Sequence, residues 1–293
     1  MKCYVFPGLG SQSVGMGRDL WDFNPRARAV FDEVDAALGE KLSGLIFEGP
    51  ADMLDLAQNI QPAIFAVSVA AARAAAINAG FIAGHSLGEY SALCAAGAIS
   101  IADAARLLRR RGELMQSAVP DRAGAMGVII GSLPVPAICA AATKDAGGTC
   151  EPANDNGLEQ VVISGNRAAV EKALELAKGQ GAKIAKLLPV SVPAHSSLMQ
   201  PIVEEFRAEI EKIAWSRPKI KFISNKTAAV MDDVEEIKNS LAYQMTHGVR
   251  WRECVSVMPT FGIREVIEVG PGSVLTGLVK RIDPKLNAHV LGS

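Results

Sequence analysis

The sequence predicts an α/β protein with a mostly parallel sheet at its core. Short apolar segments at residues 3–6, 81–83 and 266–269 have the length and composition of buried strands, and glycine or proline directly follows each of them. Helical stretches separate them, including an alanine-rich one at residues 63–79 that Arg73 interrupts. We interpret that stretch as a buried core helix and not as a membrane span. Strands that alternate with helices are typical of this fold class.

A second pattern lies between Pro120 and Pro189. Its segments read strand, helix, strand, helix and strand, at residues 125–130, 136–144, 161–163, 167–178 and 182–188. A β-α-β, β-α-β order of this kind indicates a ferredoxin-like α+β subdomain inserted into a larger domain. We therefore expect a large domain from residues 1–121 and 189–293 and a small one from residues 122–188. A chain of 293 residues is long enough for both.

Composition excludes several classes of function. Hydrophobic residues make up 49% of the chain and aromatic residues 5%, which predicts a globular core of aliphatic side chains. A formal charge of -1 argues against general nucleic-acid binding. The five cysteines are scattered without metal-ligand spacing, so we expect free thiols, no metal site and a reducing compartment. The first residues read as a strand and not as a signal peptide, which predicts a cytoplasmic protein without a membrane anchor.

The most informative motif is Gly84-His85-Ser86-Leu87-Gly88, which directly follows the strand at residues 81–83. A G-x-S-x-G sequence between a strand and a helix is the pattern of a nucleophile elbow. A side chain at either glycine would crowd the turn. The main-chain N–H of Leu87 would then face developing negative charge at the helix N-terminus. The alternative is a tight turn that only happens to contain serine.

A serine nucleophile needs a base, and the chain has four histidines. His85 adjoins the serine, so packing is the role we prefer for it on these grounds. His195 lies in a proline-containing loop before a helix and is the candidate base. A purely structural role remains the alternative for His195. If the protein were an α/β-hydrolase, its triad histidine would come late in the chain and would be His247 or His289.

Arg111 is the second informative residue. It falls within the apolar stripe of the helix predicted at residues 101–116, among Leu107, Leu108 and Leu114. A buried guanidinium needs an anionic partner. Arg111 could therefore form an internal salt bridge, or it could bind a substrate carboxylate in its planar fork.

These residues together resemble the family of malonyl-CoA:acyl carrier protein transacylases, essentially from end to end. The matching segments are Phe6-Pro7-Gly8-Leu9-Gly10-Ser11-Gln12, Gly84-His85-Ser86-Leu87-Gly88-Glu89-Tyr90, Arg111-Gly112-Glu113-Leu114-Met115-Gln116, Gly124-Ala125-Met126, Gln160-Val161-Val162-Ile163-Ser164-Gly165, Pro193-Ala194-His195 and Glu268-Val269-Gly270-Pro271-Gly272. Each match alone is weak, but their number and order are specific.

The resemblance implies an α/β-hydrolase-like large domain and a set of site residues. Ser86 would be the nucleophile, His195 its base and Arg111 the clamp on the malonyl carboxylate. A main-chain carbonyl near Arg250 would orient the histidine, which makes a Ser-His dyad. The implied oxyanion hole is the main-chain N–H of Leu9 and of Leu87, and Gln12 and His85 would contact substrate.

The implied activity is ping-pong transfer of malonyl from malonyl-CoA to the phosphopantetheine thiol of acyl carrier protein, for fatty-acid synthesis. No tightly bound cofactor is implied, and a monomer is expected. A trans-acting acyltransferase of a polyketide pathway and an acyl-thioester serine hydrolase are the alternatives, with a catalytically dead docking module as the non-enzyme reading. Lys280 and Arg281 are candidates for docking the acidic carrier.

Two positions depart from the family pattern. Leu9 stands where glutamine is usual, which keeps a main-chain donor but removes the amide side chain. Arg250 stands where glutamine or asparagine is common, which would change the charge beside His195. Acceptance of methylmalonyl groups would depend on the shape of the pocket near His195.

Overall fold

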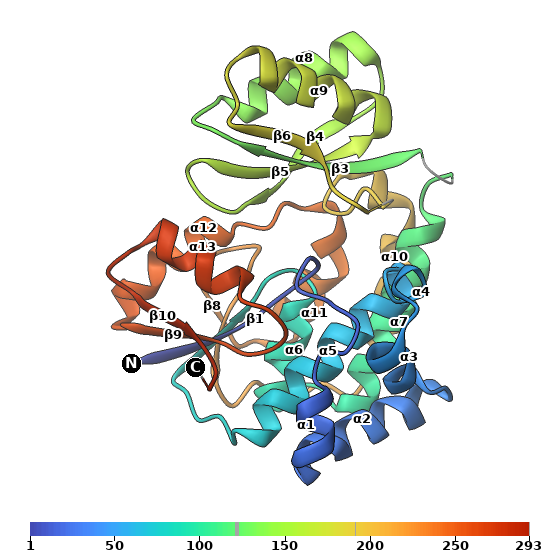
Figure 1. Ribbon diagram of the computed structural model, residues 1–293, viewed down its shortest axis with the longest axis vertical. Helices are drawn as coiled ribbons and strands as arrows, with labels where there is room; N and C mark the ends of the chain where they lie inside the picture. The colour runs from blue at the N-terminus through green and yellow to red at the C-terminus, as the bar shows by residue number, and fades with distance from the viewer. Residues whose placement is uncertain (121–122, 191, 293) are drawn as a thin grey trace.

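The computed structural model describes residues 1–120, 123–190 and 192–292, and these residues form two separate sheets with their helices (Figure 1). The expected domain boundary at residues 121 and 122 lies outside the described residues. The larger sheet and most helices form the lower body in Figure 1, and the smaller sheet lies above it.

The larger sheet has the strand order β10-β9-β1-β2-β7-β8. Neighbours are parallel except for the edge pair β7 and β8, which is antiparallel. Its strands are β1 (Lys2–Phe6), β2 (Phe81–Gly84), β7 (Lys221–Ile223), β8 (Val230–Met231), β9 (Glu265–Glu268) and β10 (Asn287–Val290). The predicted strands at residues 3–6, 81–83 and 266–269 are therefore confirmed as neighbours β1, β2 and β9.

Helices cover both faces of this sheet. Side chains along a strand point alternately to the two faces, and in this sheet both faces carry apolar, buried side chains. In β1, Tyr4 and Phe6 pack in one core cluster, whereas Cys3 and Val5 pack in the other. The helices on the Phe6 side include α2 (Pro25–Leu38), α5 (Ala57–Ala74), α6 (Gly88–Ala95) and α7 (Ile101–Ser117), and those on the Val5 side are α12 (Trp251–Val257) and α13 (Val274–Ile282).

The remaining helices of the large domain are peripheral or short. They are α1 (Arg18–Phe23), α3 (Leu42–Glu48), α4 (Ala51–Leu54), η1 (Ser197–Ile202), α10 (Val203–Glu211), α11 (Val234–Tyr243), η2 (Gln244–Thr246) and η3 (Met258–Phe261). No helix among the described residues is long and apolar enough to cross a membrane.

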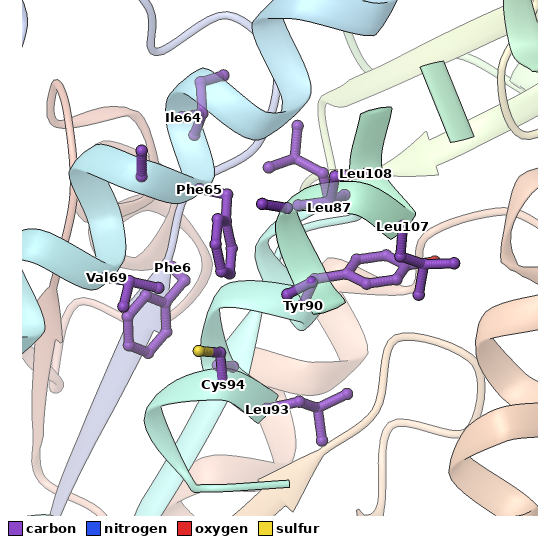
Figure 2. Packing of buried hydrophobic residues seen from close by; sticks show 14 of the residues in the cluster. Phe6, Ile64, Phe65, Val69, Leu87, Tyr90, Leu93, Cys94, Leu107 and Leu108 are labelled. Atoms are coloured by element: carbon purple, nitrogen blue, oxygen red, sulfur yellow. The ribbon is translucent and has the colours of Figure 1, made fainter. Parts of the chain in front are cut away.

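Helices α5, α6 and α7 meet β1 in a dense core directly below the elbow. Figure 2 shows Phe6 of β1 packed with Phe65 of α5, and Tyr90 of α6 beside Leu107 of α7. Phe6, Phe65 and Tyr90 are all 0% exposed. Close packing of this kind leaves the start of α6 little freedom to move.

The smaller sheet is antiparallel, with the order β4-β5-β3-β6, and two helices cover one of its faces. Its elements are β3 (Gly124–Ile130), α8 (Val135–Ala146), β4 (Cys150–Asp155), β5 (Gln160–Asn166), α9 (Arg167–Gly179) and β6 (Ile184–Leu187). The predicted strands and helices are present in the predicted order. Strand β4 was missed, because proline, asparagine and aspartate have low strand propensity.

The face of the smaller sheet that lacks helices is turned toward the larger domain. Helices α8 and α9 lie on its far side in Figure 1. The contacts that attach β4 to the large domain include the bridge between Asn154 and Val249, the ion pair between Asp155 and Arg252, and the hydrogen bonds that Ser197 donates to Glu151. The two domains thereby enclose a cavity at the end of β2.

Candidate active site

Ser86 lies at the sharp turn between β2 and α6, and its backbone is left-handed, with φ of 53°. A non-glycine residue rarely adopts this conformation, and such strain is concentrated at functional sites. Both flanking glycines are sterically required. A Cβ on Gly84 would lie 2.0 Å from the carbonyl carbon of Gly88, and one on Gly88 would lie 2.1 Å from the carbonyl oxygen of Phe6.

Ser86 and His195 are brought together from positions far apart in the sequence. Ser86 Oγ lies 2.7 Å from His195 Nε2. The other ring nitrogen, Nδ1, lies 2.9 Å from the carbonyl oxygen of Gln244 and 3.0 Å from that of His247. Carbonyl oxygens only accept hydrogen bonds, so this pairing assigns the proton to Nδ1. Nε2 is then free to accept the proton of the Ser86 hydroxyl.

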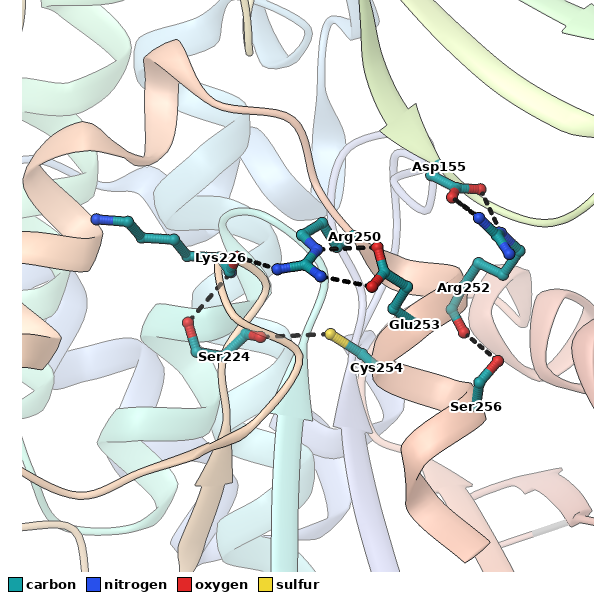
Figure 3. A network of polar contacts seen from close by, with 8 residues as sticks. All are labelled: Asp155, Ser224, Lys226, Arg250, Arg252, Glu253, Cys254 and Ser256. Carbon is teal, nitrogen blue, oxygen red and sulfur yellow. Dashed lines mark hydrogen bonds and ion pairs between the residues drawn. The ribbon is translucent and has the colours of Figure 1, made fainter. Parts of the chain in front are cut away.

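The expectation that Arg250 supplies the carbonyl for His195 is wrong. Its carbonyl oxygen accepts the hydrogen bond of Cys254 N–H at 2.9 Å, because Arg250 is the N-cap of α12. Its guanidinium pairs with Glu253 and donates to the carbonyl oxygen of Lys226 (Figure 3). The positive charge of Arg250 is therefore balanced outside the cavity and does not change the charge beside His195.

Burial keeps the His195 ring neutral. His195 is only 4% exposed. Desolvation, together with the nearby positive charge of Arg111, lowers the pKa of His195 to about 3. The hydrogen bonds from Nδ1 to the two carbonyls oppose this shift but are outweighed. A neutral imidazole can act as a base at physiological pH.

Arg111, in the middle of α7, is 1% exposed and reaches the same cavity. Its Nη1 donates to Gln61 Oε1 at 2.5 Å, and its Nη2 donates to Gln244 Oε1 at 2.9 Å and lies 3.4 Å from Ser86 Oγ. Its Nε is buried without a hydrogen-bond partner among the described residues, and Arg111 forms no ion pair there. The internal salt bridge, one of the two sequence-based interpretations, is therefore absent from the described part of the chain.

Three buried amides that the sequence did not single out complete the site. Gln61 and Gln244 both hold Arg111, and the Oδ1 of Asn225 accepts the main-chain N–H of Ser86 at 2.8 Å. Gln61 could have been noticed as an amide within the apolar stretch of α5. Gln244 and Asn225 gave no such signal, because they act across more than a hundred residues of sequence.

The cavity has a volume of about 390 Å³, a size suited to an acyl group and part of its carrier. Ser86, His195 and Arg111 line it together with Leu9, Gln12 and His85. Gln12 Oε1 accepts from Gly10 N–H, and His85 Nε2 lies 2.8 Å from Asn156 Oδ1. Most other lining residues are apolar, and they include residues of β3, β5, β6 and α13 and of the segment that follows β6.

The two expected oxyanion donors come from different segments, and of the two only Leu9 is among the described residues that line the cavity. Leu87 follows Ser86 and leads into α6, whereas Leu9 lies in the loop after β1. Within the described residues, neither main-chain N–H donates a hydrogen bond to another protein group. Both donors are therefore available to a ligand, and neither requires a particular side chain at position 9.

A strained serine paired with a neutral histidine in an acyl-sized cavity is the arrangement of a serine enzyme that acts on acyl groups. The chain belongs to the acyl transferase family, since the family model described as "Acyl transferase domain" matches residues 3–288. It is an acyltransferase.

Individual relatives are similar over nearly the whole chain. A Malonyl CoA-acyl carrier protein transacylase of Bacillus subtilis is 43% identical over 288 residues, which cover 97% of this chain and 90% of the relative. The solved acyl-carrier-protein-S-malonyltransferase of Bartonella henselae is 46% identical with a TM-score of 0.96, over 100% of this chain and 95% of the other. A malonyl-transacylase solved in complex with a type II PKS acyl-carrier protein is 39% identical with a TM-score of 0.96, over 100% and 96% of the two chains.

Proposed function

We propose that this protein transfers the malonyl group of malonyl-CoA to the phosphopantetheine thiol of an acyl carrier protein of fatty-acid synthesis, through a malonyl ester of Ser86. The observation that carries this proposal is the position of Arg111. Its buried guanidinium lacks a carboxylate partner among the described residues and lies 3.4 Å from Ser86 Oγ. The names of the relatives support the same two substrates.

In the first half-reaction Ser86 Oγ attacks the thioester carbonyl carbon while His195 Nε2 takes the hydroxyl proton. The oxygen of the tetrahedral intermediate accepts hydrogen bonds from the N–H groups of Leu87 and Leu9. The C–S bond then breaks, and His195 returns the proton to the sulfur of the departing CoA. The product is an ester on Ser86.

In the second half-reaction the carrier's thiol gives its proton to His195 and attacks the same carbonyl carbon. The ester C–O bond breaks, and Ser86 recovers the proton from His195. Arg111 holds the malonyl carboxylate through both steps. An acetyl group leaves the guanidinium buried without an anion, so it is disfavoured.

Docking of the carrier is proposed at the side of the cavity formed by α13. Val274, Leu275 and Leu278 of this helix line the cavity, and Lys280 and Arg281 follow in its last turn. An acidic carrier would meet this positive charge as its thiol enters. Transfer from the acyl-enzyme to carrier should therefore slow with added salt and in Lys280→Glu, whereas acylation by malonyl-CoA should not.

The role of the smaller domain is also proposed. Residues 122–188 would act as a subdomain that covers the acyl group and limits access of water to the ester. The chain is expected to work as a monomer, without a tightly bound cofactor.

Intact-mass measurement tests the reaction directly. With malonyl-CoA the wild-type protein should gain one malonyl group, which should move to holo carrier protein when this is added. Ser86→Ala should show no adduct, because the nucleophile is gone. A wild-type protein without adduct would contradict the proposal, and an adduct lost to water as fast as to carrier would indicate the hydrolase. Comparing holo carriers of fatty-acid and polyketide systems identifies the carrier.

A further inference from the structure

Glu89, the second residue of α6, is a buried acid with no assigned role in the reaction. It is 1% exposed and forms no ion pair among the described residues. Burial raises the pKa of Glu89 to about 7, against the effect of its hydrogen bonds and of Arg111. Because an isolated buried carboxyl group is costly, its retention calls for a physical reason.

Both oxygens of Glu89 accept hydrogen bonds from groups of the active site. Oε1 accepts from the main-chain N–H of Asn225 at 2.7 Å, and Oε2 accepts from Gln244 Nε2 at 2.5 Å. Gln244 Nε2 also donates to the carbonyl oxygen of Ser86 at 3.0 Å. The amide nitrogen of Gln244 therefore faces two acceptors.

The amide oxygen of Gln244 faces the opposite way, toward Arg111. It accepts from Arg111 Nη2 at 2.9 Å, while the main-chain carbonyl of the same residue accepts from His195 Nδ1. Rotating this amide by half a turn would place its oxygen against Glu89 and the Ser86 carbonyl. It would also place its NH₂ group against the guanidinium. The ionised carboxylate of Glu89 only accepts hydrogen bonds, so in this form it selects one of these two nearly isosteric orientations.

We propose that Glu89 is a positioning residue that fixes the amide of Gln244, so that the amide oxygen holds Arg111 in place for the substrate carboxylate. The inference rests on the proposed function, because it takes Arg111 as the carboxylate clamp. Glu89 does not touch the acyl group, and it acts on selectivity through Gln244.

Glu89→Gln is the isosteric variant that tests the acceptor requirement. A glutamine at this position has one acceptor and one donor group, but it faces two donors. The N–H of Asn225 is part of the backbone and cannot rotate, so the new amide oxygen should stay on it. The new NH₂ group then faces Gln244, whose amide turns over and removes the acceptor from Arg111.

The conservative variant Glu89→Asp is the matched control. It keeps a carboxylate at position 89, so the amide of Gln244 keeps its orientation and its oxygen stays on Arg111. Its side chain is one methylene shorter, so its absolute rates with malonyl-CoA and acetyl-CoA should fall together, while its preference for malonyl is kept.

The measurement is the ratio of kcat/KM for acylation of Ser86 by malonyl-CoA and by acetyl-CoA, in protein whose fold is checked by thermal unfolding. We expect this ratio to fall at least tenfold in Glu89→Gln, mainly through KM for malonyl-CoA, and to stay within threefold of wild type in Glu89→Asp. An unchanged ratio in Glu89→Gln, or an equal loss of the ratio in Glu89→Asp, overturns the inference. If Glu89 had a purely structural role, its replacement would lower kcat/KM for malonyl-CoA and for acetyl-CoA by the same factor.

If Glu89→Gln does not fold, the same ratio is measured in Gln244→Met. This variant leaves Glu89 in place but removes the oxygen from Arg111, so the same loss of malonyl preference is required, and a retained preference overturns the inference. Failure of the proposed function is a different result, since wild-type protein would then form no malonyl adduct at all.

Discussion

The two walls of the cavity differ in kind. The large domain supplies Ser86, His195 and Arg111, together with the buried amides that hold them. The smaller sheet supplies mostly apolar side chains, among them Met126 and Val128. The groups that we propose for charge recognition and proton transfer therefore all belong to the large domain, whereas the smaller sheet contributes mainly apolar surface to the cavity. Substitutions on the two walls should therefore have different signatures.

The largest effect is expected on the polar wall, in His195→Ala. Without a base within 2.7 Å of Ser86 Oγ, acylation by malonyl-CoA should slow by about 10²–10⁴-fold, while the protein remains folded. Rapid-quench mass measurement gives the rate. If His195→Ala were acylated at a rate within tenfold of wild type, proton transfer would not depend on His195.

The next effect is electrostatic and concerns the pKa of His195. Arg111 and burial both lower this pKa, to about 3, so replacing Arg111 by an uncharged side chain should raise it. We expect the His195 ring to remain neutral from pH 8 to pH 5 in wild type and its pKa to be higher in Arg111→Met. NMR titration of ¹³C-labelled histidine, assigned with His195→Ala, measures both values. An unchanged or lower pKa in Arg111→Met would contradict this account.

The same shift has a consequence for stability. The unfolded imidazole takes up its proton near its ordinary pKa of 6.5, whereas the folded one does so only near 3. The unfolded state therefore binds more protons in this window, and His195 lowers the free energy of unfolding as pH falls from 6.5 toward 3. The stability of His195→Ala should depend less on pH there, as chemical denaturation at several pH values can show.

On the apolar wall, Val128→Ala should have a smaller and unselective effect. The substitution removes two methyl-sized contacts worth about 0.8 kcal/mol each, so KM for malonyl-CoA and for acetyl-CoA should rise together by no more than about fifteenfold. Steady-state kinetics with both substrates measures this. A change of more than threefold in the malonyl-to-acetyl ratio would mean that the smaller domain takes part in charge recognition.

The smallest effect is expected at the contact between the two domains. The Arg252–Asp155 ion pair is partly exposed, at 37% and 31% of the two side chains, so it is screened by solvent. Arg252→Met should lower the free energy of unfolding by no more than about 1 kcal/mol. Urea unfolding checks this value, and a loss several times larger would show that the apolar wall depends on this attachment.

The sequence predicted the local features well. The elbow could be predicted because its G-x-S-x-G pattern is complete within five residues. Arg111 could be singled out because it is a charged residue within the apolar stripe of a helix. The strands β1, β2 and β9 were visible as short apolar runs. The strand β4 was not, since Pro152, Asn154 and Asp155 owe their strand conformation to pairing with β5.

Contacts between distant segments were beyond the reach of local patterns. Gln244 approaches Arg111 across 133 residues, and nothing near Gln244 marks it as different from any other helical glutamine. The error at Arg250 has the same origin. The predicted segment, residues 249–251, lies just after the residues that approach His195, because only the course of the backbone decides that Gln244 and His247 present their carbonyls.

Arg111→Met is the decisive variant for the proposal that a buried arginine beside Ser86 selects a carboxylated acyl group. Acylation of Ser86 by malonyl-CoA and by acetyl-CoA would be followed by intact mass in wild type and in this variant, which keeps the volume but removes the charge. The account predicts that malonyl transfer falls by at least a hundredfold while acetyl transfer stays within tenfold of wild type. An equal loss for the two substrates would contradict it.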